Sequence, residues 1–184
     1  MHVLKFVNEI FIRRTVMSMI ENFMSVDSEK FAAIINGQED ILDLEENAEN
    51  GDQEGYSIFD VDKAWAAIQY ILCKDTDEGE LPMGYVIPMG VENAIDCDLD
   101  FGAFYLTAEQ VKEACDYLHS LSNSTIKQMY DVHFQSMVED EIYPIVQDED
   151  ENEFYEYIHS YLLELREFYK KTAQKDRAVI FYIM

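Results

Sequence analysis

The spacing of apolar residues predicts an amphipathic helix over residues 60–73, DVDKAWAAIQYILC, the segment that holds the only tryptophan. Its apolar positions recur at intervals of three and four, which places them on one helical face: Val61, Ala64, Trp65, Ile68 and Leu72. Asp60 is the expected N-cap, because its carboxylate can accept hydrogen bonds from the free N–H groups of the first turn. We therefore expect this helix to anchor the core.

A second helix is predicted after Asp27, which also suits the N-cap position. Phe31, Ile34 and Ile35 are expected to point inward from this helix, and Gly37 is expected to end it.

The second half of the chain has stronger helix signals. Thr107 and Gln110 form a capping box at the start of a predicted helix over residues 107–121. One shorter helix, or two, is expected between residue 122 and Pro144. A long helix follows the acidic stretch DEDENEF and ends near three lysines, a charge polarity that suits the helix dipole.

Strands are expected in three places: near Met17, over residues 103–106, and in the C-terminal run RAVIFYIM. Because that last run is continuously apolar and rich in strand formers, it is predicted to lie in mid-sheet with both faces covered. Residues 38–57 contain no basic residue and are interpreted as an acidic, solvated connection, with a docking surface for a basic partner as the alternative.

These elements predict a single α+β domain over residues 17–184. It comprises a small mixed sheet, which includes the C-terminal strand, packed with about five or six helices. Residues 1–16 are interpreted as an N-terminal extension, because Asn8, Glu9 and two arginines break the pattern of a signal peptide. The sequence also lacks an apolar run long enough to span a membrane.

Charge restricts the possible partners. The formal net charge is −25, and residues 1–16 contribute +2, so the predicted domain carries −27. Such a field repels nucleic acids and anionic membranes, and it attracts basic proteins at rates that fall with salt. We therefore expect neither a nucleic-acid partner nor a membrane partner. A requirement for solubility alone would explain the same charge, so that alternative stays open.

The motifs of common chemistries are missing from the sequence. Three separated cysteines, Cys73, Cys97 and Cys115, indicate a reduced, cytoplasmic protein with packed thiols. The run from Asp96 to Asp100 lacks the glycine and the final glutamate that an EF-hand loop requires. The glycine motifs of nucleotide-binding proteins and the serine elbow of hydrolases do not occur. We expect no cofactor and no metal, and the pattern favours a non-catalytic protein over an enzyme.

Several segments together resemble the bacterial YfbM-like family of unknown function: MSMIENFMSVD, DVDKAWAAIQYIL, AFYLTAEQVKEACDYL, IYP and FYKKTAQKDRAVIFYI. The resemblance begins at Met17 and leaves residues 1–16 outside it. It implies an α+β domain with no established reaction. It also implies that relatives often have His where this chain has Gln69. Some relatives resemble genes near secreted toxin systems, which implies a cytoplasmic immunity role as one option.

Two functions follow as hypotheses. The first is a protein-binding module, in its sharpest form an immunity protein that neutralises a basic toxin. Its acidic docking surface would comprise Glu45, Glu46, Glu49, Asp52, Asp148, Glu149 and Asp150. The second is a small-molecule binder or enzyme with a cleft beside the tryptophan helix, lined by Asp62, Trp65, Gln69, Tyr105 and Tyr143. The first gains support if the acidic segments lie together, and the second requires a pocket beside that helix. The sequence gives no oligomeric state.

Overall fold

The computed structural model describes residues 20–48, 54–76, 79–146 and 148–184. The predicted extension therefore lies outside the described residues. The described elements, in chain order, are β1 Glu21–Val26, α2 Ser28–Ile35, α3 Ile41–Ala48, β2 Tyr56–Asp60, α4 Trp65–Cys73, the short 3₁₀ helices η1 Met83–Tyr85 and η2 Val91–Asn93, β3 Ala94–Ile95, β4 Ala103–Leu106, α5 Ala108–Ser120, α6 Asn123–Glu139, α7 Glu151–Gln174 and β5 Ala178–Ile183.

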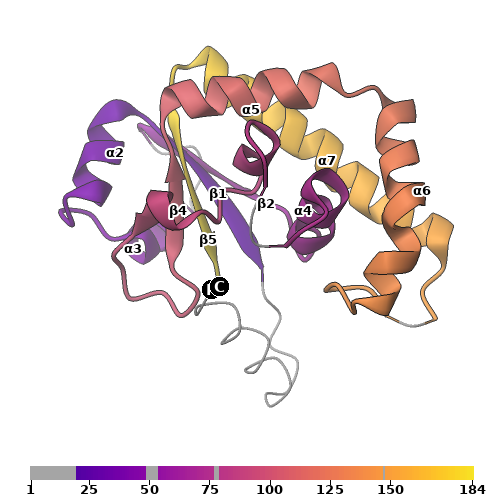
Figure 1. Ribbon diagram of the computed structural model, residues 1–184. Coiled ribbons are helices and arrows are strands. Elements are labelled where there is room, and N and C mark those ends of the chain that lie inside the picture. The colour runs from indigo at the N-terminus through magenta and orange to yellow at the C-terminus, as the bar shows by residue number, and fades with distance from the viewer. Residues whose placement is uncertain (1–19, 49–53, 77–78, 147) are drawn as a thin grey trace.

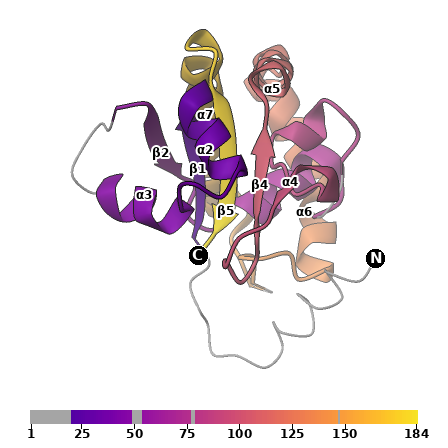
Figure 2. The ribbon, with the colours of Figure 1, turned by 90° about the vertical axis from the view of Figure 1, so that its left-hand side faces the viewer.

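The described strands form one sheet in the order β2-β1-β5-β4-β3, and every neighbouring pair is antiparallel. β5 occupies the centre, and all of its residues are buried. Helices α2 and α3 cover one face of the sheet, whereas α4, α5, α6 and α7 pack over the other (Figure 1, Figure 2). The structure confirms the α+β class and the central, covered C-terminal strand, in a sheet that is antiparallel rather than mixed.

Alternation along the strands builds a separate core on each face of the sheet. Phe23 faces the α4–α7 side, where its ring centroid lies 5.0 Å from that of Phe181 and 5.9 Å from that of Phe168. Met24, the next residue, faces α2 and α3 together with Tyr182. Because both faces of the central strand β5 are covered, its six residues, AVIFYI, include no charged side chain.

The capping signals of the second half are confirmed. The N–H of Thr107 donates to Oε1 of Gln110 at 2.9 Å, and the Thr107 hydroxyl accepts from the N–H of Gln110. Ser122 caps α6, which continues unbroken to Glu139. Asp150 caps α7, the longest described helix at 24 residues. None of the described helices is long and apolar enough to cross a membrane.

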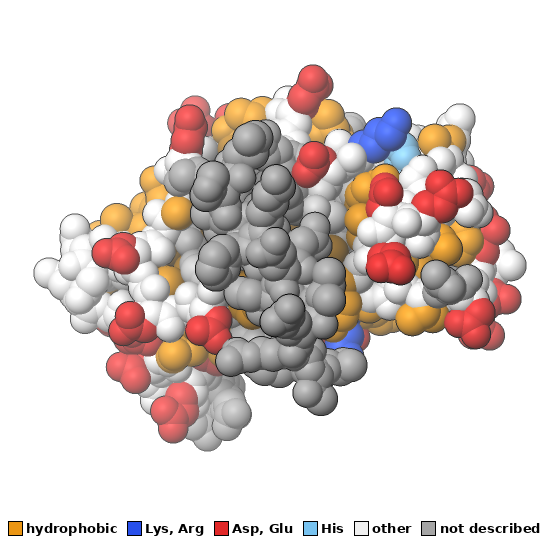
Figure 3. Space-filling model, turned by 60° about the horizontal axis from the view of Figure 1, so that its bottom comes forward, with side chains coloured by type: hydrophobic (Ala, Val, Ile, Leu, Met, Phe, Trp, Pro, Cys, Tyr) orange, Lys and Arg blue, Asp and Glu red, His pale blue; other side chains and the backbone are white. Residues whose placement is uncertain are grey.

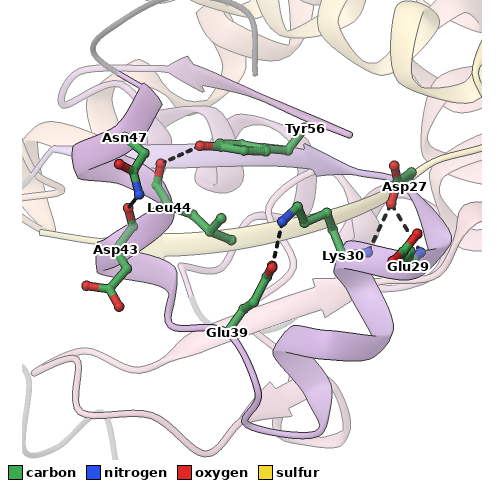
Figure 4. A network of polar contacts seen from close by, with 8 residues as sticks. All are labelled: Asp27, Glu29, Lys30, Glu39, Asp43, Leu44, Asn47 and Tyr56. Atoms are coloured by element: carbon green, nitrogen blue, oxygen red, sulfur yellow. Dashed lines mark hydrogen bonds and ion pairs between the residues drawn. The ribbon is translucent and has the colours of Figure 1, made fainter. Parts of the chain in front are cut away.

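The stretch predicted as an acidic, solvated connection instead holds helix α3 and the start of strand β2. Ile41 and Leu44 lie about one turn apart and are buried on the α2 and α3 side of the sheet. The hydroxyl of Tyr56 donates to the carbonyl of Leu44 at 2.9 Å, and Lys30 on α2 pairs with Glu39 at 2.6 Å (Figure 4). Acidic residues occupy the outer face of α3. The acidic composition of this segment therefore led to the prediction of a loop, although its apolar residues form one face of a helix.

The tryptophan helix is shorter than predicted, since α4 begins at Trp65 and Asp60 ends β2 instead of capping the helix. The N–H of Val61 donates to the carbonyl of Glu21 at 3.0 Å, so strand pairing continues past the predicted helix start. The inward position expected for Ile35 is also wrong, because 42% of its surface is exposed in the last turn of α2.

Candidate functional site

The structure keeps part of the predicted cleft together. Trp65 and Gln69 lie about one turn apart on α4, with only 6% and 1% of their surfaces exposed. The carboxylate of Asp62, before this helix, accepts a hydrogen bond from the hydroxyl of Tyr157 at 2.9 Å. That hydroxyl also accepts from the N–H of Lys63 at 3.3 Å. Asp62 therefore links the end of β2 to α7.

The two tyrosines predicted to border the cleft do not meet there. Tyr105 lies on the opposite face of the sheet, with its ring centroid 5.5 Å from that of Phe31 on α2. Tyr143, which follows α6, is half-buried and packs against the larger core. Trp65 is also part of that core. Gln69, among the predicted residues, lines a pocket formed by described residues.

A pocket of about 490 Å³ opens beside Gln69, between α4, the loop of residues 79–93 and the first turn of α5. Its polar side chains come from Gln69, Tyr85, Glu92, Asn93 and Gln110. Oε1 of Gln69 is buried and has no hydrogen-bond partner among the described residues. Leaving a buried acceptor unpaired costs about 1–3 kcal/mol, which a ligand's donor would recover.

The loop wall of this pocket is held by close packing. A Cβ atom on Gly84 would lie 2.5 Å from the carbonyl oxygen of Gly79, so the two backbone segments can approach only where glycine occurs. The buried hydroxyl of Tyr169 on α7 lies 2.9 Å from the carbonyl oxygen of Tyr85 and 3.0 Å from that of Val86, and it donates to this pair. The pocket wall is therefore a fixed part of the fold.

The described lining of the pocket combines polar and apolar side chains and has no positively charged one. Nε2 of Gln110 donates to the hydroxyl of Tyr85 at 3.4 Å, while Oε1 of Gln110 is engaged in the cap of α5. The Tyr85 hydroxyl accepts that bond and can donate its own proton to a ligand. Glu92 adds a carboxylate. This lining disfavours an anion and suits a neutral or cationic molecule with both donors and acceptors.

Sequence reasoning identified Gln69 but missed the residues opposite it, which belong to other elements. The available signal was the spacing of Gly79, Gly84 and Gly90 around two prolines, which marks a compact loop. That signal does not indicate which helix the loop packs against.

Glu21 is a second polar residue that the sequence interpretation missed. It is fully buried at the start of β1, and neither carboxyl oxygen has a hydrogen-bond partner among the described residues. Burial, helped by the nearby carboxylates of Asp60 and Asp62, raises its pKa to about 10. Glu21 is therefore uncharged at neutral pH. Its position two residues before Phe23 was the available signal, because alternate residues share a strand face.

The structure does not bring the predicted acidic docking residues into one surface. Glu45 and Glu46 lie on α3, whereas Asp148, Glu149 and Asp150 lie before α7, at the other end of the molecule (Figure 1). Viewed from below, acidic side chains occupy both sides of the molecule instead of a single patch (Figure 3). Glu49 and Asp52 lie outside the described residues.

The described residues contain no group of three or more His, Cys, Asp or Glu side chains arranged to hold a metal ion. Cys73, Cys97 and Cys115 are free thiols. Burial raises the pKa of Cys73 to about 11, and burial also raises the pKa of Cys115. Because the thiolate is the reactive form, these two thiols are poor nucleophiles at neutral pH.

The family model described as a Domain of unknown function (DUF1877) matches residues 17–182. The chain belongs to this family. The DUF1877 fold seen here is also similar to the crystal structure of YfbM from Escherichia coli, a protein of unknown function. The TM-score is 0.65, with 18% sequence identity over 90% of this chain and 99% of that one. At this identity the likeness concerns the fold alone. No curated protein matches the chain. The resemblance to a YfbM-like family is thus confirmed.

Proposed function

We propose that this DUF1877 protein binds a small polar molecule without negative charge in the pocket beside Gln69. The observation that carries the proposal is Gln69, which lines the pocket and whose Oε1 atom is buried and unpaired among the described residues. Native proteins pair nearly all of their buried polar atoms, so an unpaired acceptor at a pocket favours a ligand that supplies the donor.

The size and lining of the pocket set the class of ligand. Its volume of about 490 Å³ is within the range of small-molecule sites. Amide groups and the Tyr85 hydroxyl would pair with a neutral ligand, and Leu81, Ile87 and Met89 would contact its apolar part. The described lining offers no cysteine, serine or histidine, and Glu92 supplies its one carboxylate, so we propose binding as the simpler role of this pocket.

Replacing the amide should separate stability from binding. We expect Gln69→Leu to unfold at the same temperature as the wild type or at a higher one, because it removes a buried acceptor that has no partner. The same substitution should abolish the shift in unfolding temperature caused by any hit from a library of neutral and cationic small molecules. Differential scanning fluorimetry measures both effects, and calorimetric titration then gives the affinity of each hit.

Gln135→Leu, an equivalent change on the exposed face of α6, is the matched control and should leave every hit unaffected. The proposal fails if Gln69→Leu lowers the unfolding temperature and no library member stabilises the wild type. It also fails if each hit stabilises Gln69→Leu as strongly as it stabilises the wild type.

A second candidate function is binding of a basic protein, including neutralisation of a basic toxin by an immunity protein. The net charge of −25 favours this function, since such a field speeds association with basic partners. Because the acidic residues of α3 and those before α7 lie at opposite ends, a compact partner would use one end only.

Charge-removing pairs of substitutions would identify that end. Asp43→Asn with Glu46→Gln neutralises two exposed positions on α3, and Asp148→Asn with Asp150→Asn neutralises two exposed positions before α7. We expect one pair to reduce capture of a basic partner at low salt, and the other pair to leave it unchanged. Capture should be lost in roughly 0.5 M salt, where charges are screened within a few ångströms. Equal capture by both variants, or indifference to salt, would exclude an electrostatic docking surface.

A further inference from the structure

β2 forms one edge of the described sheet, and its pairing shows which of its backbone groups face outward. β2 pairs with β1 alone among the described strands. The N–H of Asp27 donates to the carbonyl of Gly55 at 2.8 Å, and the N–H of Val61 donates to that of Glu21 at 3.0 Å. Backbone groups alternate in direction along an antiparallel strand. Ser57 and Phe59, at odd positions between these two bonds, therefore face β1, and Ile58 directs its N–H and C=O outward.

A groove of about 640 Å³ lies beside this edge, between β2 and the second half of α7. Ile58 is part of its wall, so the outward backbone groups and the groove adjoin. At the groove, the rings of Phe59 and Phe168 are stacked, with centroids 5.4 Å apart. The groove shares no lining residue with the Gln69 pocket.

The charges along the groove are ordered. Early in α7, the hydroxyl of Tyr157 accepts from the N–H of Lys63, just beyond the end of β2, so α7 runs antiparallel to β2. The exposed carboxylates of Glu164 and Glu167 therefore lie toward the Asp60 end of the edge. The exposed ammonium groups of Lys171 and Lys175 lie toward the Ser57 end.

The helix spacing is close to that of a strand. Glu164 precedes Phe168 by four residues and Lys171 follows it by three, which is roughly 6 Å and roughly 4.5 Å along the helix. Alternate residues of an extended strand are separated by roughly 7 Å. A strand beside β2 would thus place three consecutive groove-facing side chains next to the acidic, the aromatic and the basic part of the groove.

We propose that this edge binds an extended segment of a partner protein, added antiparallel to β2. Read from its N-terminus, the segment carries a basic, an apolar and an acidic side chain at alternate positions. The basic side chain meets Glu164 and Glu167, the apolar one meets Phe59 and Phe168, and the acidic one meets Lys171. The backbone of the segment pairs with the N–H and C=O of Ile58, as in other cases of strand addition to a sheet edge. The inference rests on the second candidate function, protein binding, and assigns that function to the edge of β2.

Two peptides of identical composition test this inference on the full-length protein. The first is fluorescein-labelled Thr-Lys-Thr-Val-Thr-Glu-Thr, and the second has its lysine and glutamate exchanged. We expect the first to bind about fivefold more tightly in fluorescence polarisation, because exchange puts like charges opposite each other. The double variant Lys171→Glu and Lys175→Glu, at exposed positions of α7, should lose or invert this preference.

Hydrogen exchange supplies the backbone readout. The amide of Ile58 should exchange more slowly when the first peptide is bound, whereas the amides of Ser57 and Phe59, already paired with β1, should change little. Ile58→Pro removes an outward N–H, which an edge strand tolerates, and also shortens a half-buried side chain that packs on the α2 and α3 side. We expect it to lower the unfolding temperature and to abolish binding while a cooperative thermal transition is retained. Ile58→Val, which keeps the N–H, should retain binding.

Several outcomes would overturn the inference. If the Ile58 amide is already protected in the free protein, another part of the chain covers the edge. If sedimentation shows a dimer that the peptide dissociates, a second copy occupies it. Equal binding of both peptides, or binding that leaves Ile58 exchange unchanged, contradicts the proposed register. A basic partner whose capture depends on an acidic end and not on Ile58→Pro would support the protein-binding candidate but exclude this site.

Discussion

A chain that ends at Arg177 is expected to lose its cooperative thermal unfolding transition and its near-ultraviolet circular dichroism. This truncation removes β5, which joins β1 to β4 in the centre of the sheet. Burying Val179, Ile180 and Phe181 contributes roughly 5–9 kcal/mol, at about 1.5–3 kcal/mol for each side chain. That range is comparable with the whole stability of an ordinary domain, about 5–15 kcal/mol. Both cores would also lose their common wall.

A chain that ends at Ile183 is the matched control. It lacks only Met184, whose side chain is exposed and whose backbone exchanges two hydrogen bonds of 3.0 Å with Ile20. We expect its unfolding temperature to lie a few degrees below that of the full chain. If the chain ending at Arg177 also retained a cooperative transition, β5 would not be required for the fold.

The isosteric substitution Glu21→Gln is expected to stabilise the protein at pH 7. The pKa of Glu21 rises from 4.5 to about 10 on folding, so the folded protein must hold a proton that the unfolded chain releases at neutral pH. The stability contributed by this carboxyl is fully present below about pH 4.5 and is lost as the pH rises toward 10. At pH 7 the cost is about 3 kcal/mol, at 1.36 kcal/mol for each pH unit above the unfolded pKa. A glutamine side chain is uncharged at every pH, so its burial does not require the uptake of a proton.

Urea denaturation at pH 5, 7 and 9 measures this effect. The free energy of unfolding of the wild type should fall across the series relative to that of Glu21→Gln, so the gain from the substitution grows with pH. Glu46→Gln, at an exposed position on α3, should follow the wild type at all three values. Loss of stability in Glu21→Gln at pH 7 would show that the carboxyl is ionised and paired in the folded protein.

Capping residues and apolar runs correctly predicted the helices and strands that depend on neighbouring residues in the sequence. The capping box of Thr107 and Gln110 fixes the start of α5 within a few residues, and the apolar run of β5 identifies a covered strand. Helix α3 depends on contacts with residues far away in the sequence. Ile41 and Leu44 are buried against a sheet whose strands come from both ends of the chain, so no short stretch of sequence reveals the contact. The same reason explains Asp60, which remains in a strand because Val61 pairs with Glu21.

The candidate site divides in the same way. Gln69 could be singled out because it lies about one turn beyond Trp65 on a recognisable helix. Tyr85 and Gln110 come from a loop and a helix whose packing against α4 is a tertiary event. Glu21 occurs in an ordinary strand pattern. Its raised pKa results from burial in the folded protein, which its local sequence does not reveal.

The pairing of β1 with β5 also has a kinetic consequence. Val26 lies opposite Ala178, and Glu21 lies opposite Ile183, so the central contact of the sheet joins residues more than 150 positions apart. Closing so long a loop lowers the conformational entropy of the chain before the pairing of β1 with β5 contributes any stabilisation. Helices α5, α6 and α7 can form before the sheet closes, since their hydrogen bonds are local. We therefore expect refolding to show early helix formation and a slower phase in which the two ends of the sheet meet.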